Sequence, residues 1–146
     1  DYDALWVFGH DLVALYGEDK VKAIAEKTKL FVYSGTNENP TAELAHWTLP
    51  SAAYVEKDGT FVNCDGHVQR IGRAFPPLAD SREDWRFLLE LATALGEPFK
   101  LKKPVDVFLN LAETEAAFAG LTYKAIGDAG AALATTTSRE EAPASS

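Results

Sequence analysis

The sequence predicts an α/β fold that begins with a partial Rossmann-like parallel sheet and continues into a hairpin-rich segment and C-terminal helices. Three observations support this prediction. Two short apolar runs, each closed by a glycine, enclose an amphipathic stretch, which is the pattern of a strand–helix–strand unit. Asp-Gly dipeptides beside extended stretches are typical of hairpin turns. Two later stripes of apolar residues recur at helical spacing.

The strand–helix–strand unit lies near the N-terminus. The apolar run over residues 4–8 is typical of a buried strand. In residues 19–29, apolar and charged side chains occupy opposite faces of a helix. A second apolar run over residues 30–33 is closed by Ser34 and Gly35. Two strands joined in this way normally form a right-handed parallel crossover.

Candidate ligand loops follow these two strands. Ligands of open parallel sheets bind beyond the carboxyl ends of the strands, which here are residues 9–11 and 34–39. In the first loop, His10 and Asp11 could form an acid–base pair. Asp11 is equally suited to cap a short helix over residues 12–16, so both interpretations stay open.

The sheet is expected to continue beyond the second loop. Pro40 is suited to open a short helix over residues 41–45. Residues 46–49 form a third short apolar run, which Pro50 is expected to stop. Trp47 in this run, like Trp6 and Trp85, is expected to belong to the core.

Two hairpin turns are predicted next. Residues 54–63 contain Asp58-Gly59 between extended stretches, and Asp65-Gly66 precedes a short strand over residues 68–71. Asp-Gly favours the positive backbone φ of tight hairpin turns.

The clearest helix is expected to start at Ser81, with Ser81 and Asp84 as a capping box, and to end at Gly96. Its apolar stripe consists of Trp85, Leu88, Leu89, Ala92 and Leu95. A second apolar pattern runs through Val105, Phe108, Leu109, Leu111 and Ala112 and predicts a further helix. We therefore divide the chain into an α/β domain (1–97), a helical extension (98–133) and a disordered tail (134–146).

Composition excludes several classes of function. The 146 residues are 47% hydrophobic and 25% charged, as in globular domains, and contain no apolar stretch of the length that spans a membrane. The net charge of -8 opposes binding to nucleic acid. Cys64 is the only cysteine, so this segment holds no iron–sulfur cluster by its own thiolates. We expect Cys64 to be half-buried, and a zinc site of His46, Cys64 and His67 is not favoured because these residues lack a standard ligand spacing.

One crossover and a few short strands make a poor complete domain. A parallel sheet requires cover on both faces, and the sequence supplies few helices to provide it. The chain also contains no methionine. We therefore expect the chain to be a segment of a longer polypeptide, or a subunit that folds against a larger partner.

Residues 36–96 carry a series of motifs in a fixed order. They begin with Thr36-Asn37-Glu38-Asn39-Pro40-Thr41-Ala42-Glu43 and Ala45-His46-Trp47-Thr48-Leu49-Pro50, continue with Glu56-Lys57-Asp58-Gly59-Thr60-Phe61-Val62-Asn63, Gly66 and Val68-Gln69-Arg70, and close with Arg82-Glu83-Asp84-Trp85 and Leu95-Gly96. In order and spacing this series resembles the end of the central domain of molybdopterin oxidoreductases, and especially the large iron–sulfur subunit of respiratory NADH–quinone oxidoreductase, or complex I. Asp65 and His67 stand where that family more often has Glu and Arg.

The resemblance implies a structural part of the NADH-oxidising peripheral arm of complex I. Such a segment supports electron transport to quinone without being catalytic alone. Its implied partners are the rest of the parent subunit and other subunits of the complex, on the cytoplasmic side of the inner membrane, peripheral and without membrane insertion. The cysteine motifs for iron–sulfur clusters lie upstream in such proteins. This segment is therefore expected to hold no cofactor and no metal.

Six motif positions could line a pterin pocket in catalytic relatives, although no catalytic residue is expected among them: Glu56, Gly59, Thr60, Asn63, Gly66 and Gln69. A structural role is favoured, because glycines permit tight turns and Thr and Asn bond local backbone groups. Glu56 could also pair with Arg70 or Arg73 across the hairpin. Two alternatives for the whole chain stay open. One is a fragment of a catalytic molybdopterin enzyme such as formate dehydrogenase, and the other is a free-standing small α/β binding module.

Overall fold

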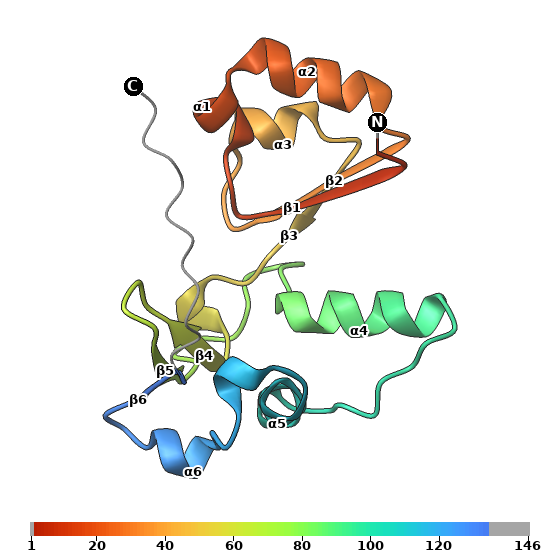
Figure 1. Cartoon of the computed structure of the whole chain (residues 1–146). Coiled ribbons are helices and arrows are strands. Elements are labelled where there is room, and N and C mark those ends of the chain that lie inside the picture. The colour runs from red at the N-terminus through yellow and green to blue at the C-terminus, as the bar shows by residue number, and fades with distance from the viewer. Residues whose placement is uncertain (1, 135–146) are drawn as a thin grey trace. The chain divides into compact units, whose positions relative to one another are not determined.

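The computed structural model describes residues 2–134, and the contacts within the chain divide it into two compact units (Figure 1). The first unit comprises the chain up to Lys57 together with Arg73–Phe99. The second comprises Asp58–Gly72 together with the chain from Lys100 onward. The division into 1–97, 98–133 and 134–146 stays a prediction, and residues 135–146 of the predicted tail lie outside the described part of the chain.

The first unit contains the predicted parallel sheet. Its three strands lie in the order β1–β2–β3, and both neighbouring pairs are parallel. The strands are β1 (Ala4–Phe8), β2 (Leu30–Gly35) and β3 (Trp47–Pro50). The connecting helices are α1 (Leu12–Tyr16), α2 (Glu18–Lys27) and α3 (Pro40–Leu44). The α/β prediction and its strand–helix–strand unit are confirmed.

Helices α1, α2 and α3 all lie over the same face of this sheet (Figure 1). Phe31 and Tyr33 of β2 point into that layer and are 0% and 4% exposed. They pack with Val21 of α2 and Ala42 of α3. The apolar stripe of α2 thus meets alternate residues of the central strand, as the period of two in a strand requires.

The first predicted hairpin turn is wrong. Tyr54–Glu56 forms a 3₁₀ turn, η1, instead of a strand, and Gly59 already belongs to strand β4 (Gly59–Val62). Glu56 closes the 3₁₀ turn, because its amide donates to the carbonyl of Ala53 at 2.9 Å and its carboxylate accepts from the Ala53 amide at 2.9 Å.

The second predicted turn is confirmed, between β4 and β5 (His67–Ile71). The Asn63 side chain accepts from the amides of Asp65 and His67 at 3.0 and 2.8 Å, and Gly66 has φ of +73°. This antiparallel pair is extended by β6 (Ala131–Ala132).

Helix α4 (Asp84–Ala94) belongs to the first unit and begins later than predicted. Ser81 does not cap it, since its hydroxyl donates to the carbonyl of Leu78 at 2.7 Å. The Asp84 carboxylate instead accepts from Ser51 at 2.5 Å and from Lys57 at 3.0 Å. The predicted end is confirmed, with Gly96 at φ of +91°. No residue of this helix is buried among the described residues.

The second unit has its own small core. The predicted helix α5 (Pro104–Thr114) is confirmed, and it is followed by η2 (Ala116–Phe118) and α6 (Tyr123–Ile126). Phe108 of α5 packs with Val68 of β5 and with Ile126 of α6. Throughout residues 2–134, no helix combines the length and the apolar character needed to cross a membrane.

Candidate functional site

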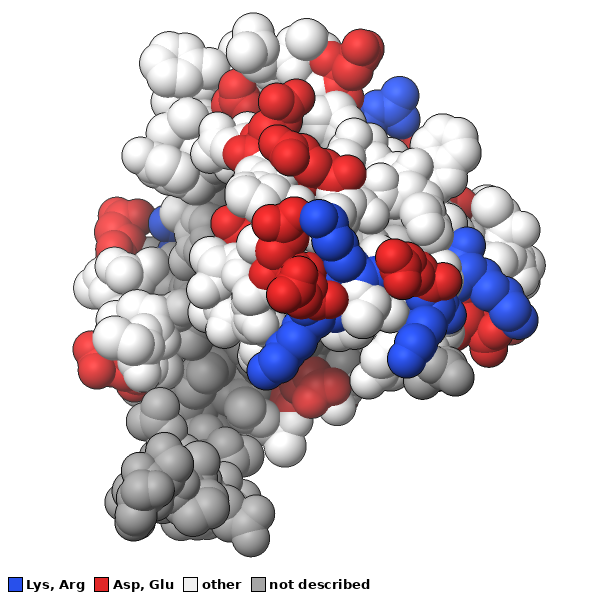
Figure 2. Space-filling model, turned by 90° about the horizontal axis from the view of Figure 1, so that it is seen from above, with Lys and Arg blue, Asp and Glu red and all other residues white. Residues whose placement is uncertain are grey.

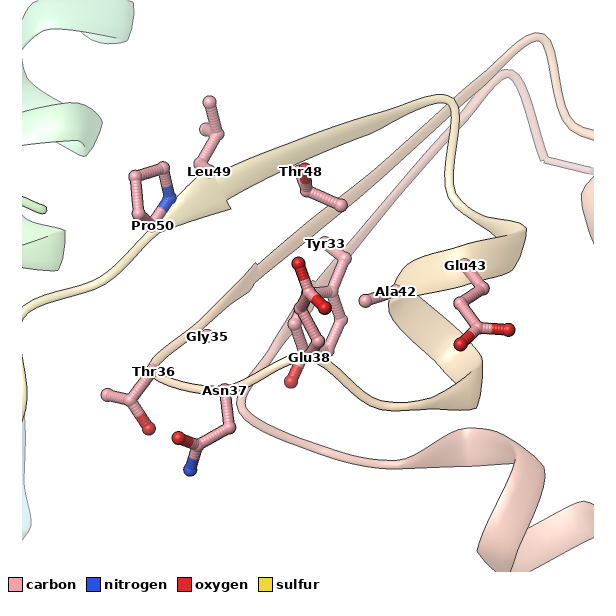
Figure 3. A pocket seen from close by; sticks show the side chains of 10 residues that line it. All are labelled: Tyr33, Gly35, Thr36, Asn37, Glu38, Ala42, Glu43, Thr48, Leu49 and Pro50. Atoms are coloured by element: carbon pink, nitrogen blue, oxygen red, sulfur yellow. The ribbon is translucent and has the colours of Figure 1, made fainter. Parts of the chain in front are cut away.

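A cleft of about 460 Å³ lies at the carboxyl ends of β2 and β3, beside α3 (Figure 3). Its walls come from the loop after β2, from the start of α3 and from the end of β3. This is the edge at which open parallel sheets bind ligands. The cleft therefore coincides with residues 34–39, one of the two loops predicted to face a ligand.

Tyr33 and Gly35 line the cleft, and Asn39 outside the lining holds the Tyr33 ring in place. The Tyr33 ring lies across Gly35, where a Cβ atom would overlap the ring. The Tyr33 hydroxyl accepts from the Asn39 side-chain amide at 2.7 Å, and the Asn39 carbonyl oxygen caps α3 by accepting from the Ala42 amide at 3.0 Å. Strand, loop and helix are thus held together by two side chains.

Replacing Gly35 with Ala should displace the Tyr33 ring and break its hydrogen bond to Asn39. Overpacking of this kind costs about 1–3 kcal/mol of unfolding free energy. Thermal or urea unfolding measures the loss. Gly72→Ala is the matched control, because a Cβ atom at Gly72 meets nothing within 4 Å. Equal stability of the two variants would contradict the tight contact between Tyr33 and Gly35.

The charged side chains that line the cleft are acidic. Among the described residues that line it, Glu38 and Glu43 carry carboxylates and no residue carries a positive charge. Figure 3 shows Glu38 turned back toward the cleft, whereas Thr36 and Asn37 extend outward from the loop. A carboxylate with neighbouring amide and hydroxyl groups suits a ligand rich in N–H donors. The same set opposes a phosphate, which requires Arg, Lys or clustered backbone amides.

The first predicted ligand loop is occupied by structural hydrogen bonds. Asp11 caps α1 by accepting from the Ala14 amide at 3.2 Å, and it accepts from the Thr41 hydroxyl at 2.8 Å. The same Thr41 oxygen accepts from the Val13 amide at 3.0 Å. The helix-cap interpretation of Asp11 is confirmed. Its carboxylate ties the loop after β1 to the fully buried Thr41 of α3.

The six motif positions do not converge on one face of the hairpin. Thr60 pairs with Arg70, and the adjacent pair joins Phe61 to Gln69. Successive residues of a strand point to opposite faces, so Thr60 and Gln69 point apart. Asn63 and Gly66 form the turn, Gly59 opens β4, and Glu56 closes η1. A cofactor role for these positions stays a prediction.

Arg70 contacts Tyr123, whereas the sequence suggested Glu56 as its partner. Its guanidinium lies 4.9 Å from the centre of the Tyr123 ring. Burial raises the pKa of the Tyr123 hydroxyl, while the charge of Arg70 acts in the opposite direction. The contact is a cation–π interaction within the second unit.

The three residues considered for zinc serve other purposes. The His46 Nδ1 atom accepts from the Phe31 amide at 3.0 Å, and His67 Nε2 lies 3.0 Å from the carbonyl of Ala129. Cys64 is exposed, and the prediction that it is half-buried is wrong because it lies in the hairpin turn. Within residues 2–134, no group of three His, Cys, Asp or Glu side chains is placed to hold a metal ion.

The second feature of the site is the other face of the parallel sheet. Trp6, Val32 and Trp47 stand side by side in the strand register, with Phe8 and Leu30 on the same face. Trp6 stacks on Phe8 with 5.0 Å between ring centres and donates to the Ser34 hydroxyl at 2.7 Å. Trp47 is 67% exposed, Leu30 42% and Phe8 39%. We call these five residues the open sheet face.

The helix-covered side of the sheet exposes charged side chains to solvent. Residues 18, 19, 20, 22, 26 and 27 of α2 are exposed and charged, and Lys22 pairs with Glu18 at 2.5 Å. Seen from above the helices, acidic and basic side chains lie beside each other on this surface (Figure 2). The charged residues of α2 thus face solvent on one side of the sheet, and the rings of Trp47 and Phe8 are exposed on the other. The sequence had assigned Trp47 to the core, and that assignment is wrong within the described chain.

These observations define the class of the chain as a Rossmann-like α/β segment with a strand-end cleft and one uncovered sheet face. The family model for molybdopterin oxidoreductase matches residues 1–94, and the chain belongs to this family. The predicted family membership is confirmed. The match to the large iron–sulfur subunit of complex I in particular stays a prediction.

Several curated proteins are similar to the chain. It is 33% identical over 122 residues to the probable oxidoreductase YjgC of Bacillus subtilis, and the matched residues cover 83% of this chain and 12% of that protein. It is 34% identical over 119 residues to the NADPH-Fe(3+) oxidoreductase subunit alpha of Geobacter sulfurreducens, covering 81% and 14%. It is 32% identical over 124 residues to the putative formate dehydrogenase YrhE of Bacillus subtilis, covering 84% and 13%. The chain therefore spans only 12% to 14% of the length of these relatives.

A solved structure shares the fold. Acetylene hydratase from Pelobacter acetylenicus superimposes with a TM-score of 0.58 at 19% sequence identity. The match covers 73% of this chain and 15% of that one. At this identity the likeness supports the fold alone.

Proposed function

We propose that this chain is a segment of the large subunit of an oxidoreductase, in which it completes an α/β domain and is not catalytic alone. The observation that carries the proposal is the open sheet face. A parallel sheet normally has both faces covered, and this face exposes the rings of Trp47 and Phe8 together with Leu30. The relatives are much longer than this chain, which supports a parent protein whose remaining segments would cover this face.

In the first version of this function, the parent is the large iron–sulfur subunit of respiratory NADH–quinone oxidoreductase. The ordered motifs of residues 36–96 support it. The parent would carry iron–sulfur clusters and pass electrons from NADH toward quinone, as a peripheral subunit on the cytoplasmic side of the inner membrane. This segment would then support the electron-transfer chain together with neighbouring subunits.

In the second version, the parent is a catalytic molybdopterin enzyme such as a formate dehydrogenase. Relatives with that printed name and the acidic cleft favour it. The lining fits the ring end of a pterin or guanine, because a carboxylate such as Glu38 accepts hydrogen bonds from ring N–H and amino groups. It does not fit the phosphates of such a cofactor. The bound cofactor would supply the redox-active metal, and this chain would only hold and orient the ring.

Metal analysis of the natural full-length protein separates the two versions. Stoichiometric molybdenum or tungsten supports the second version, whereas iron–sulfur and flavin subunits without molybdenum support the first. A lone, metal-free chain of this size that unfolds cooperatively would instead support the small binding module.

A substitution in the cleft tests the second version directly. In the second version, Glu38→Gln should lower retention of the pterin cofactor by about tenfold, since it removes a charged hydrogen-bond acceptor. Fluorescence of the released pterin measures retention. Glu26→Gln on the exposed surface of α2 makes the same charge change and should leave retention unaltered. Equal retention in the two variants would exclude Glu38 from the cofactor site.

A further inference from the structure

A second cavity of the first unit is lined by three arginines. It measures about 350 Å³ and shares no lining residue with the strand-end cleft. Arg73, Arg82 and Arg86 come from separate positions in the chain, and Glu83 and Glu90 also line the cavity. The lining thus gathers three of the positive side chains of a chain whose net charge is -8.

The backbone of Arg82 and the side chain of Arg86 each have defined partners. The backbone of Arg82 extends the edge of the sheet, with its amide donating to the carbonyl of Pro50 at 3.1 Å and its carbonyl accepting from Ala52 at 2.8 Å. Arg86 Nε lies 2.6 Å from a carboxylate oxygen of Glu83, which is only 4% exposed.

The ion pair between Arg82 and Glu90 is weaker than the one between Arg86 and Glu83. The Arg82 guanidinium lies 3.3 Å from the Glu90 carboxylate, and the two side chains are 56% and 64% exposed. Exposed ion pairs contribute little, because water screens them and two long side chains must be ordered. An incoming anion can therefore replace Glu90 at small cost.

We propose that this arginine cavity binds the phosphate group of a small molecule. The planar guanidinium group donates two parallel hydrogen bonds, which match the oxygens of a phosphate. The volume exceeds that of a lone phosphate and lies within the range of small-molecule pockets, about 300–1,000 Å³. The site is independent of the proposed function, since it uses neither the cleft nor the open sheet face.

Calorimetric titration of the natural full-length protein with inorganic phosphate, adenosine 5′-monophosphate and adenosine tests the proposal. We expect saturable binding of phosphate that weakens with salt, and no binding of adenosine. Arg82→Gln should weaken phosphate binding by about tenfold, through loss of a charged hydrogen-bond donor. Glu90→Gln should tighten it, because it removes the competing carboxylate. Tighter binding of the monophosphate than of phosphate would identify a phosphate ester as the ligand, and equal binding would identify free phosphate.

Lys20→Gln is the matched control, as Lys20 is exposed on α2 and the net charge changes by the same amount. This variant should bind phosphate like the natural protein. The opposite directions expected for Arg82→Gln and Glu90→Gln separate the proposal from misfolding, which would only weaken binding. Absence of saturable phosphate binding, adenosine binding as tight as the monophosphate, or equal affinities in the Arg82, Glu90 and Lys20 variants would each overturn it.

Discussion

Replacing Trp47 with Asp should have opposite consequences in two contexts. In the isolated chain Trp47 is 67% exposed, so we expect a change within about 0.5 kcal/mol of unfolding free energy. In the full-length subunit the same side chain should lie beneath the covering elements. Burying a charge in place of a large aromatic ring should cost about 3 kcal/mol or more there. Urea unfolding of both forms measures the difference.

Tyr16→Asp is the control for this experiment. Tyr16 is 60% exposed and lies on α1, on the side of the sheet that the helices already cover. Tyr16→Asp, like Trp47→Asp, replaces an aromatic side chain with a charged one at a similar exposure. We expect it to be tolerated in both contexts. If Trp47→Asp were tolerated in the full-length subunit as well, the open sheet face would not be an internal contact.

Replacing Phe31 with Ala should cause the largest loss of stability within the chain itself. Phe31 is 0% exposed and packs between the sheet and the helices α2 and α3. Removing a buried phenyl ring costs about 3–5 kcal/mol, because transfer free energy is lost and a cavity is left. Chemical unfolding of the 146-residue chain measures this loss.

The matched control is Phe75→Ala. Phe75 is 62% exposed in the same unit, and its loss should change stability by no more than about 0.5 kcal/mol. A destabilisation of similar size in both variants would mean that the helix-covered layer is not the core of this unit.

Much of the parallel sheet could be predicted because its signals are local. The period of α2 and the short apolar runs on either side are visible within about 30 residues, and Asn39 and Pro40 mark the start of α3. The predictions were wrong where two local signals competed. Asp58-Gly59 has the chemistry of a hairpin turn, but the Glu56 carboxylate closes a 3₁₀ turn immediately before it. Ser81 similarly has the chemistry of a cap and bonds elsewhere.

The candidate site depended on contacts that no local pattern encodes. The polar loop after β2 was predicted to face a ligand, but the hydrogen bond between Asn39 and Tyr33 depends on the ring lying across Gly35. The arginine cavity brings Arg73 and Pro77 beside residues 81–90, and no local pattern places these two segments together. The exposure of Trp47 was missed because an apolar strand gives the same pattern whether its cover is supplied by its own chain or by another segment.

Hydroxyl-radical footprinting tests most directly whether the chain completes a larger domain through its open sheet face. Oxidation of Trp47 and Phe8 would be measured by mass spectrometry in the isolated chain and in the natural full-length protein, with Tyr16 as the internal reference. We predict strong oxidation of Trp47 and Phe8 in the isolated chain and protection of both in the full-length protein, with Tyr16 oxidised equally in the two. Equal oxidation of Trp47 in both forms would contradict the proposal that the rest of the parent subunit covers this face.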